Sequence, residues 1–284
     1  MKQLTVISGK GGTGKTSLVA AFAGLSGNKV IADCDVDAAD LHLLLNPTVV
    51  EEQDFMALKT AVIDQSKCIK CGECMEKCRF DAIVDYSVDD VSCEGCGVCR
   101  LICPQNAVEL VDKVSGKAFI SKTRLGPLCH ARLFPGEEAS GKLVTHVRNN
   151  ARKVAVENNM DLILIDGSPG TGCPVIASIG GVDMALIVTE PTLSGLHDME
   201  RILAVARHFN VRPAVCVNKY DLNEEITNDI EEYCGGKNIS FVGKIPYDDA
   251  FTDAMVECMT IIEYSDNGVA DDVRGIWSEV EKIL

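Results

Sequence analysis

Residues 9–16 read Gly-Lys-Gly-Gly-Thr-Gly-Lys-Thr and follow an apolar run that contains Leu4, Val6 and Ile7. A glycine, four residues and then Gly-Lys-Thr is the spacing of a phosphate-binding loop, whose backbone N–H groups surround phosphate oxygens. A flexible glycine loop is the alternative, but it does not explain a Lys-Thr pair placed between a strand pattern and the amphipathic run 18–25. The expected nucleotide contacts of this loop are Gly11, Gly12, Thr13, Gly14, Lys15, Thr16 and Ser17.

Within this loop, Lys15 is expected to reach the β- and γ-phosphates of ATP, and the Thr16 hydroxyl is expected to bind Mg²⁺. Asp33 and Asp35 end a second apolar run. Carboxylates at the carboxyl end of a strand beside a phosphate loop can act on the metal or on water. A solvated acidic turn is the alternative for these two residues. Asp166 ends a later apolar run, and we expect it to hold Mg²⁺, often through water.

A second group of reactive residues comprises two runs of four cysteines with the same internal spacing, offset by 25 residues throughout. The spacing Cys-x₂-Cys-x₂-Cys-x₃-Cys is that of two-cluster bacterial ferredoxins, in which the fourth cysteine of each run ligates the other run's cluster. Zinc is the alternative metal, but two equal four-cysteine runs favour [4Fe–4S] cubes. Pro104 follows the second run as that spacing leads us to expect, whereas Arg79 follows the first. The predicted ligand sets are Cys68, Cys71, Cys74 and Cys103 for the first cluster, and Cys93, Cys96, Cys99 and Cys78 for the second.

The composition narrows the possible partners and compartment. The formal charge of −15 argues against nonspecific nucleic-acid binding, which needs a surface of lysine and arginine. No apolar run is long enough to span a membrane, and the acidic C-terminal segment 269–284 is unlike a membrane-surface helix. The N-terminus does not resemble a signal peptide, and 14 cysteines in such a chain point to metal in a reducing compartment. We therefore expect a cytoplasmic protein.

The elements that must position these residues alternate between strand and helix patterns. This alternation predicts an α/β fold, a mostly parallel sheet with helices on both faces, interrupted by an α+β ferredoxin domain. The expected domains are a first part of the ATPase domain at 1–59, the insert at 60–117 and a second part at 118–284. We expect strands at 29–32, within 119–134, and at 162–166, 183–189, 212–218 and 239–245, with a helix at 140–158.

The extra lysine of the loop, Lys10, resembles the deviant phosphate loop of the MinD superfamily of ATPases. Segments 130–133, 140–144, 166–174 and 189–198 are similar to that family as well. The resemblance implies a homodimer that encloses two ATP molecules, in which Lys10 reaches the partner's nucleotide. It also implies that Asp35 orients the attacking water and that Asp33 lies near Mg²⁺. Asn218 would bond adenine, and Pro246 would close over the base.

Cys129 and Cys173 lie outside both runs. In the related nitrogenase iron protein, a ligand of the [4Fe–4S] cluster that bridges the dimer holds the place of Cys173, seven residues after Asp166, and Cys129 lies roughly where the other ligand does. Two thiols from each subunit could bind one shared cluster. Ordinary buried thiols are the alternative. The remaining cysteines, Cys34, Cys216, Cys234 and Cys258, are expected in the core.

The combined motifs favour an ATPase, slow without a partner, in which dimer closure gates electron transfer through [4Fe–4S] clusters to an unidentified redox protein. The alternative is an assembly scaffold that delivers iron–sulfur clusters or metal cofactors to client proteins. A positional ATPase of the MinD kind is disfavoured by the negative charge.

Overall fold

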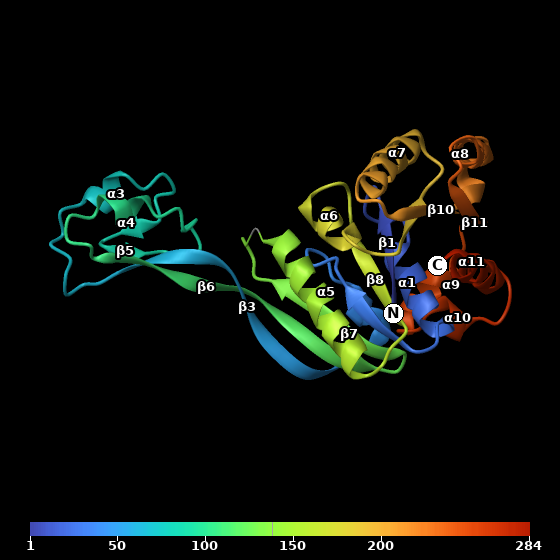
Figure 1. Cartoon of the computed structure of the whole chain (residues 1–284), viewed down its shortest axis with the longest axis horizontal. Coiled ribbons are helices and arrows are strands. Elements are labelled where there is room, and N and C mark those ends of the chain that lie inside the picture. The colour runs from blue at the N-terminus through green and yellow to red at the C-terminus, as the bar shows by residue number, and fades with distance from the viewer. Residues whose placement is uncertain (138) are drawn as a thin grey trace. The chain divides into compact units, whose positions relative to one another are not determined.

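The computed structural model describes residues 1–137 and 139–284 (Figure 1). The chain forms two compact units. The first unit comprises residues 1–53, 118–132 and 140–284. The second comprises residues 54–117 and 133–139, so it is made of two separate stretches of the chain. The expected domain boundaries after residues 59 and 117 stay a prediction.

The first unit is built on a sheet whose nine strands lie in the order β11-β10-β9-β1-β8-β2-β7-β6-β3. The pairs β1–β8, β1–β9, β2–β8, β2–β7, β9–β10 and β10–β11 are parallel. The long strands β3 and β6 continue into the second unit. The strands are β1 (Lys2–Ser8), β2 (Lys29–Asp33), β3 (Thr48–Ile63), β6 (Val108–Thr123), β7 (Gly126–Leu133), β8 (Leu162–Pro169), β9 (Met184–Thr189), β10 (Arg212–Asn218) and β11 (Ser240–Ile245).

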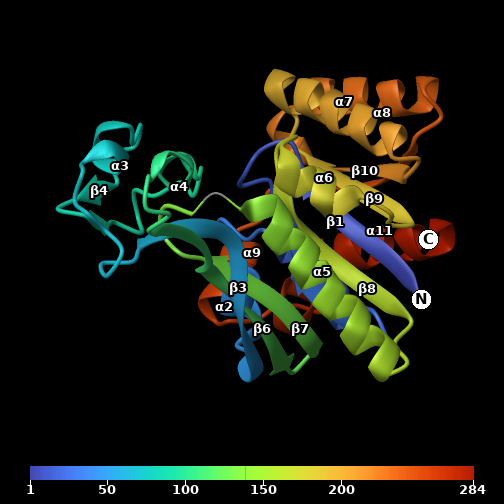
Figure 2. The ribbon, with the colours of Figure 1, turned by 60° about the vertical axis from the view of Figure 1, so that its left-hand side comes forward.

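Helices cover both faces of this sheet (Figure 2). α5, α6, α7 and α8 pack on one face, while α1, α2, α10 and α11 share an apolar core with the other face. The strands β1, β2, β8 and β9 are almost completely buried, because a parallel sheet is covered on both sides. The helices are α1 (Lys15–Leu25), α2 (Leu41–Leu45), α5 (Ser140–Glu157), α6 (Cys173–Ile179), α7 (Leu193–His208), α8 (Glu224–Gly236), α9 (Ala250–Val256), α10 (Ile261–Tyr264) and α11 (Val269–Ile283), with a short 3₁₀ turn at Tyr220–Leu222.

The predicted α/β architecture with a mostly parallel sheet is confirmed. The expected strands at 162–166, 183–189, 212–218 and 239–245 agree with β8 to β11 within a few residues, and the expected helix at 140–158 agrees with α5. Long buried apolar runs explain this agreement, because such runs separated by helical patterns leave little alternative to a covered parallel sheet.

The second unit repeats one small motif. In each cysteine run, a glycine with positive φ precedes a short helix: Gly72 (φ 85°) before α3 (Glu73–Glu76) and Gly97 (φ 77°) before α4 (Val98–Ile102). Two short antiparallel strands, β4 (Ile83–Val84) and β5 (Ser87–Val88), lie between the runs. A small apolar core of the unit contains Ala61, Ile63, Ile83 and Val108, against which several of the cysteines pack.

Three of the four cysteines expected in the core are there: Cys34, Cys216 and Cys234 are buried. The prediction for Cys258 was wrong, because this residue is exposed. It lies just after α9 in a left-handed turn (φ 53°), which turns the chain away from the helix.

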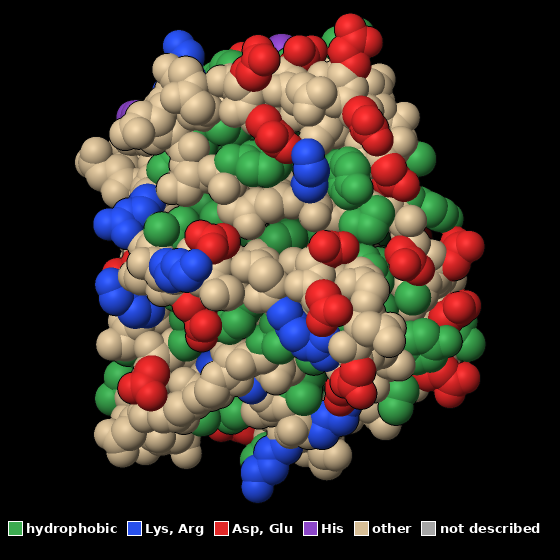
Figure 3. All heavy atoms as spheres, turned by 90° about the vertical axis from the view of Figure 1, so that its right-hand side faces the viewer, with side chains coloured by type: hydrophobic (Ala, Val, Ile, Leu, Met, Phe, Trp, Pro, Cys, Tyr) green, Lys and Arg blue, Asp and Glu red, His purple; other side chains and the backbone are tan. Residues whose placement is uncertain are grey.

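Acidic side chains are spread over the face of the molecule shown in Figure 3, with basic side chains between them. This distribution agrees with the formal charge of −15. Across residues 1–137 and 139–284, every helix is too short or too polar to cross a lipid bilayer.

Candidate functional site

The glycine-rich loop lies between the end of β1 and the start of α1. Gly14 caps α1 with a φ of 83°, a conformation that glycine adopts readily. A Cβ at Gly14 would also lie 2.4 Å from Nδ2 of Asn218, so the close approach of β10 requires glycine here. The free N–H groups of the first turn of α1 therefore point into the loop, as an anion site needs.

Lys15 connects two segments of the site. Its Nζ lies 3.1 Å from Oδ2 of Asp35 and 3.5 Å from Oδ1 of Asp166, and the Lys15 side chain is only 7% exposed. Burial alone would lower the pKa of this ammonium, but the attraction of Asp166 and Asp35 outweighs burial and raises it. Lys15 is thus held charged between the two carboxylates, in a position to exchange them for phosphate oxygens.

Asp33 is completely buried beside this ion pair. The strand register places Asp33 of β2 directly opposite Asp166 of β8. Burial raises the pKa of Asp33 well above its ordinary value, and the neighbouring charge of Asp166 adds to the rise. Its two oxygens accept the backbone N–H groups of Asp35 at 3.1 Å and Leu41 at 3.3 Å. In this structure Asp33 therefore fixes the loop that carries Asp35.

Asp166 has the features of a magnesium ligand. Burial raises the pKa of its carboxyl, although Lys15 and the Thr16 hydroxyl oppose the rise. Its Oδ2 is buried and has no hydrogen-bond partner among the residues that the structure describes. Carboxylate and hydroxyl oxygens are ligands that Mg²⁺ prefers. Asp166 and Thr16 therefore fit an ion held between the chain and a phosphate.

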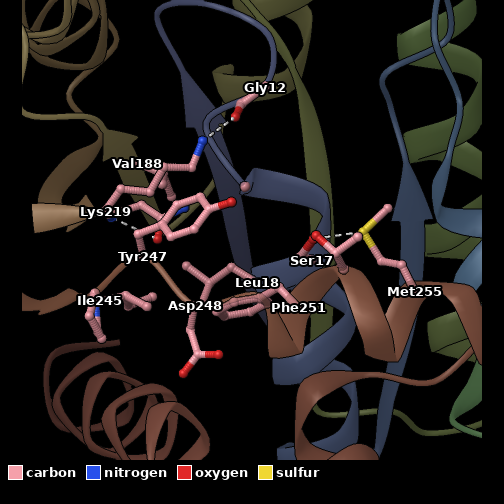
Figure 4. A pocket seen from close by; sticks show the side chains of 14 residues that line it. Gly12, Ser17, Leu18, Val188, Lys219, Ile245, Tyr247, Asp248, Phe251 and Met255 are labelled. Atoms are coloured by element: carbon pink, nitrogen blue, oxygen red, sulfur yellow. Dashed lines mark hydrogen bonds between the residues drawn. The ribbon is translucent and has the colours of Figure 1, made fainter. Parts of the chain in front are cut away.

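A pocket of about 240 Å³ opens beside the loop (Figure 4). Tyr247 and Phe251 present their rings to it, together with the apolar side chains of Leu18 and Val188. Asn218 donates from Nδ2 to the carbonyl of Thr13 at 2.9 Å, which fixes this amide at the edge of the pocket. A flat apolar base would fit between such walls. The other lining residues are Gly12, Gly14, Ser17, Lys219, Ile245, Pro246, Asp248, Thr252 and Met255.

Glu190 holds two lysines at the mouth of the loop. One carboxylate oxygen lies 2.9 Å from Nζ of Lys10, and the other lies 2.6 Å from Nζ of Lys219. Burial alone would raise the pKa of Glu190, but the bonds from Lys219 and Lys10 outweigh burial and lower it. In this single chain, Lys10 is therefore folded back onto its own subunit. Lys219 also donates to the carbonyl of Gly12 at 3.3 Å.

Each of two cavities in the second unit is lined by four thiols, and each set draws three thiols from one cysteine run and one from the other. The first cavity adds Tyr86 and Pro104 to its thiols. The second cavity adds Phe80 and Leu110. The thiols are Cys68, Cys71, Cys74 and Cys103 in the first cavity, and Cys78, Cys93, Cys96 and Cys99 in the second.

The spacing of the thiols in each set bears on the metal group that they could hold. Across the described residues, no three His, Cys, Asp or Glu side chains converge closely enough to bind a single metal ion. A cube with iron at four corners needs thiolates that stand farther apart than the ligands of one ion. Backbone N–H groups also approach the sulfurs, as in the 3.3 Å bond from Ala107 to Sγ of Cys103. The donor set of each cavity therefore fits a [4Fe–4S] cube, whose sulfurs commonly accept such bonds.

Cys129 and Cys173 lie in different surroundings. Cys129 is 0% exposed within β7, and burial raises the pKa of its thiol to about 12. Cys173 is exposed at the first residue of α6. The two thiols therefore differ in exposure, and the expected shared cluster stays a prediction.

The structure brings Lys15, Asp33, Asp35 and Asp166 together at one edge of the sheet. Sequence reasoning missed Glu190, although this residue follows β9 at the same edge as the other carboxylates. Position after a buried parallel strand was the signal that could have identified it.

Comparison with known families gives one match over most of the chain. The profile described as CbiA, the CobQ/CobB/MinD/ParA nucleotide binding domain, matches residues 4–261. Uncharacterized protein MJ0578 of Methanocaldococcus jannaschii is 38% identical over 227 residues, which cover 78% of this chain and 79% of that protein. Uncharacterized protein MJ0579 of the same organism is 26% identical over 278 residues, which cover 94% of this chain and 93% of that protein. A stretch of 49 residues, 17% of the chain, is 35% identical to pyruvate synthase subunit PorD of Methanothermobacter marburgensis and covers 60% of that subunit.

Solved structures share the fold at low sequence identity. The cell division ATPase MinD of Pyrococcus furiosus superposes with a TM-score of 0.61 and 19% identity, covering 100% of this chain and 99% of that chain. The septum site-determining protein MinD of Pyrococcus horikoshii, complexed with Mg-ADP, gives a TM-score of 0.62 and 19% identity. This match covers 99% of this chain and 96% of that chain.

Proposed function

Because the chain belongs to the CobQ/CobB/MinD/ParA family of nucleotide-binding domains, we propose that it is an ATPase in which nucleotide-driven dimer closure controls electron transfer. The observation that carries the redox part is the division of eight thiols into two cavities, with one cysteine exchanged between the runs. Each cavity would hold one [4Fe–4S] cluster, which supplies a site that accepts and releases one electron when bound. ATP and Mg²⁺ would bind at the loop of the first unit.

For hydrolysis, we assign the charged residues around the loop to separate roles. Lys15 would move from Asp35 and Asp166 to the β- and γ-phosphates, and Thr16 and Asp166 would hold Mg²⁺, which would neutralise phosphate charge. Asp35, freed from Lys15, accepts a hydrogen bond from the water that attacks the γ-phosphorus. The bond to the β-phosphate oxygen breaks, and ADP and phosphate leave. Burial raises the pKa of Asp35, which makes this carboxylate a better proton acceptor.

The two cavities stand in series along the strands that enter and leave the second unit. Ala61 and Leu110 line the second cavity, whereas Ile63 and Val108 line the first. Residues 54 and 117 bound this unit, so the second cavity lies two residues nearer to both boundaries, about 7 Å along a strand. Gly95 packs against the same strand, since a Cβ there would lie 2.1 Å from the carbonyl oxygen of Lys59. Of the two proposed cluster sites, the second cavity would therefore lie nearer along the strands to the boundary residues 54 and 117.

Lys10 provides a prediction on the dimer. We expect Lys10→Ala to bind ATP almost as well as the parent chain, but to lose ATP-dependent dimers and about a thousandfold in hydrolysis rate, because Lys10 would act on the partner's nucleotide as an arginine finger does. Sedimentation with and without ATP measures the dimer. Lys2→Ala removes an exposed lysine of β1 that pairs with Asp183, and it should change neither quantity. ATP-dependent dimers of Lys10→Ala would exclude this role.

The proposal is tested on protein purified without oxygen. Iron and sulfide counts should each approach about eight per chain. Addition of ATP should alter the electron paramagnetic resonance spectrum of the reduced protein and the rate at which it reduces an acceptor, while the iron content stays constant. Full iron content without affinity for adenine nucleotides would refute the coupling.

The alternative role as a scaffold for cluster assembly predicts loss of iron to an apoprotein in the same experiment. That role would use Cys129 and Cys173 for a labile cluster.

A further inference from the structure

Glu190 is a single carboxylate that holds two lysines beside the nucleotide loop. Its two oxygens are divided between them: Oε2 lies 2.9 Å from Nζ of Lys10, and Oε1 lies 2.6 Å from Nζ of Lys219. The Glu190 side chain is 14% exposed, against 38% for Lys10 and 29% for Lys219. Both lysines therefore reach inward from the surface to a largely buried acceptor.

The backbone around Glu190 is fixed by the start of α7. The Glu190 carbonyl accepts the N–H of Thr192 at 2.8 Å, and the Thr189 hydroxyl donates to the carbonyl of Gly195 at 3.0 Å. A Cβ at Gly195 would lie 2.3 Å from the Glu190 carbonyl oxygen, so α7 packs directly on this turn. The Glu190 carboxylate can therefore follow a departing lysine only as far as its own side chain allows.

The backbone at Lys10 is held as well. The Ser8 hydroxyl donates to the Lys10 carbonyl at 2.8 Å, and a Cβ at Gly9 would lie 2.2 Å from the Cβ of Asp198 on α7. The part of this segment that can reorient is thus the side chain of Lys10, an ammonium on a flexible four-carbon stem. To reach a nucleotide in a second subunit, this ammonium must leave Glu190.

The two lysines are not held equally. Lys219 makes the shorter contact with Glu190, and it also donates to the carbonyl of Gly12 at 3.3 Å (Figure 4). Burial alone would raise the pKa of Glu190, but the bonds from the two lysines lower it, so this carboxylate is ionised. A largely buried carboxylate without a counter-charge is costly. Departure of Lys10 avoids that cost, because Lys219 stays paired with Glu190.

We propose that Glu190 is a positioning residue that restrains Lys10 in the single chain and thereby opposes formation of the ATP-dependent dimer. The inference rests on the proposed function, in which Lys10 acts on the partner's nucleotide. Phosphate oxygens of that nucleotide compete with Glu190 for the same ammonium. Each subunit releases one Lys10 when the dimer closes, so closure breaks two of these ion pairs.

Sedimentation of the full-length protein at graded concentrations, with ATP and Mg²⁺, tests this role. Glu190→Gln keeps the shape of the side chain but removes its charge, and the dimer dissociation constant should fall about tenfold. The expected size follows from two partly exposed ion pairs, each of which changes an equilibrium by up to about fivefold. Glu190→Ala, a second variant, should lower the constant as well. Glu231→Gln is the matched control, because it removes the carboxylate that pairs with Lys244 at 2.8 Å and makes the same change in net charge, and it should leave the constant unchanged.

A double variant separates the restraint on Lys10 from a general effect of charge. Lys10→Ala combined with Glu190→Gln should form no more dimer than Lys10→Ala alone, because no ammonium remains to be released. Tighter dimers in the double variant than in Lys10→Ala would overturn the restraint, as would a dissociation constant that is unchanged or higher in both Glu190→Gln and Glu190→Ala. These results leave the proposed function standing. A parent chain that forms no dimer with ATP at any concentration would instead overturn the proposed dimer closure and the restraint together.

Discussion

Replacing Lys15 with methionine is expected to lower ATP affinity at least about a hundredfold and to lower the free energy of unfolding at pH 8 by about 3–5 kcal/mol. The affinity falls because the ammonium no longer reaches the phosphates. The stability falls because Asp33, Asp35 and Asp166 remain close together without their shared positive charge.

The loss of stability should depend on pH in a defined direction. Burial already raises the pKa values of Asp33, Asp35 and Asp166 above the ordinary value of 3.8, and removal of Lys15 raises them further. A carboxyl whose pKa is higher in the folded state contributes stability that is fully present below the unfolded pKa and is lost as the pH rises through the folded pKa. The deficit of Lys15→Met should therefore grow from about pH 4 upward.

Urea unfolding of both proteins at pH 5 and pH 8 measures this effect. Lys29→Met is the matched control, because Lys29 is also buried in the first unit but donates to the backbone carbonyl of Ser26. The loss of unfolding free energy in Lys29→Met should not grow with pH on account of these carboxylates, because Lys15 still balances their charge. If Lys15→Met lost the same unfolding free energy at both pH values, the pKa values of the three carboxyls would not depend on Lys15.

Serine substitutions should divide the eight thiols into two sets that do not follow the order of the sequence. Cys78→Ser and Cys99→Ser should each remove about four iron atoms per chain, and the double variant should lose no more than either alone. Cys74→Ser combined with Cys78→Ser should remove nearly all the iron, although these two residues belong to one run. The reason is that Cys78 lines the cavity of the second run.

Iron and sulfide analysis of anaerobic protein checks this pattern, and Cys258→Ser, which changes an exposed thiol outside both cavities, should retain all the iron. Loss of about half the iron from the Cys74 and Cys78 double variant would assign each run to its own cluster. Full iron in every single variant would mean that these thiols are not ligands.

The sequence predicted the features that depend on local patterns. The apolar runs before Gly9, Asp35 and Asp166 became β1, β2 and β8, because a buried strand needs a continuous apolar segment. Both cysteine runs are internally regular, and their spacing led to the thiol sets that line the two cavities. Whether these thiols bind iron stays a prediction.

Features that depend on distant packing could not be predicted. Nothing near Cys129 in the sequence indicates complete burial, which results from its position on an interior strand beside β2. The pairing of Lys10 with Glu190 joins residues 180 apart. Glu137 and Lys113 are closer in sequence, but they meet only because a second stretch of chain returns to β6.

β3 and β6, through which the chain enters and leaves the thiol-bearing unit, are neighbours in the sheet. An ordinary hairpin at this edge would need only a tight turn between the same two strands. The thiol-bearing unit therefore takes the place of a turn between two neighbouring strands, and its presence requires no change in the strand order of the sheet. The same edge could accept other modules in related chains without disturbing nucleotide chemistry.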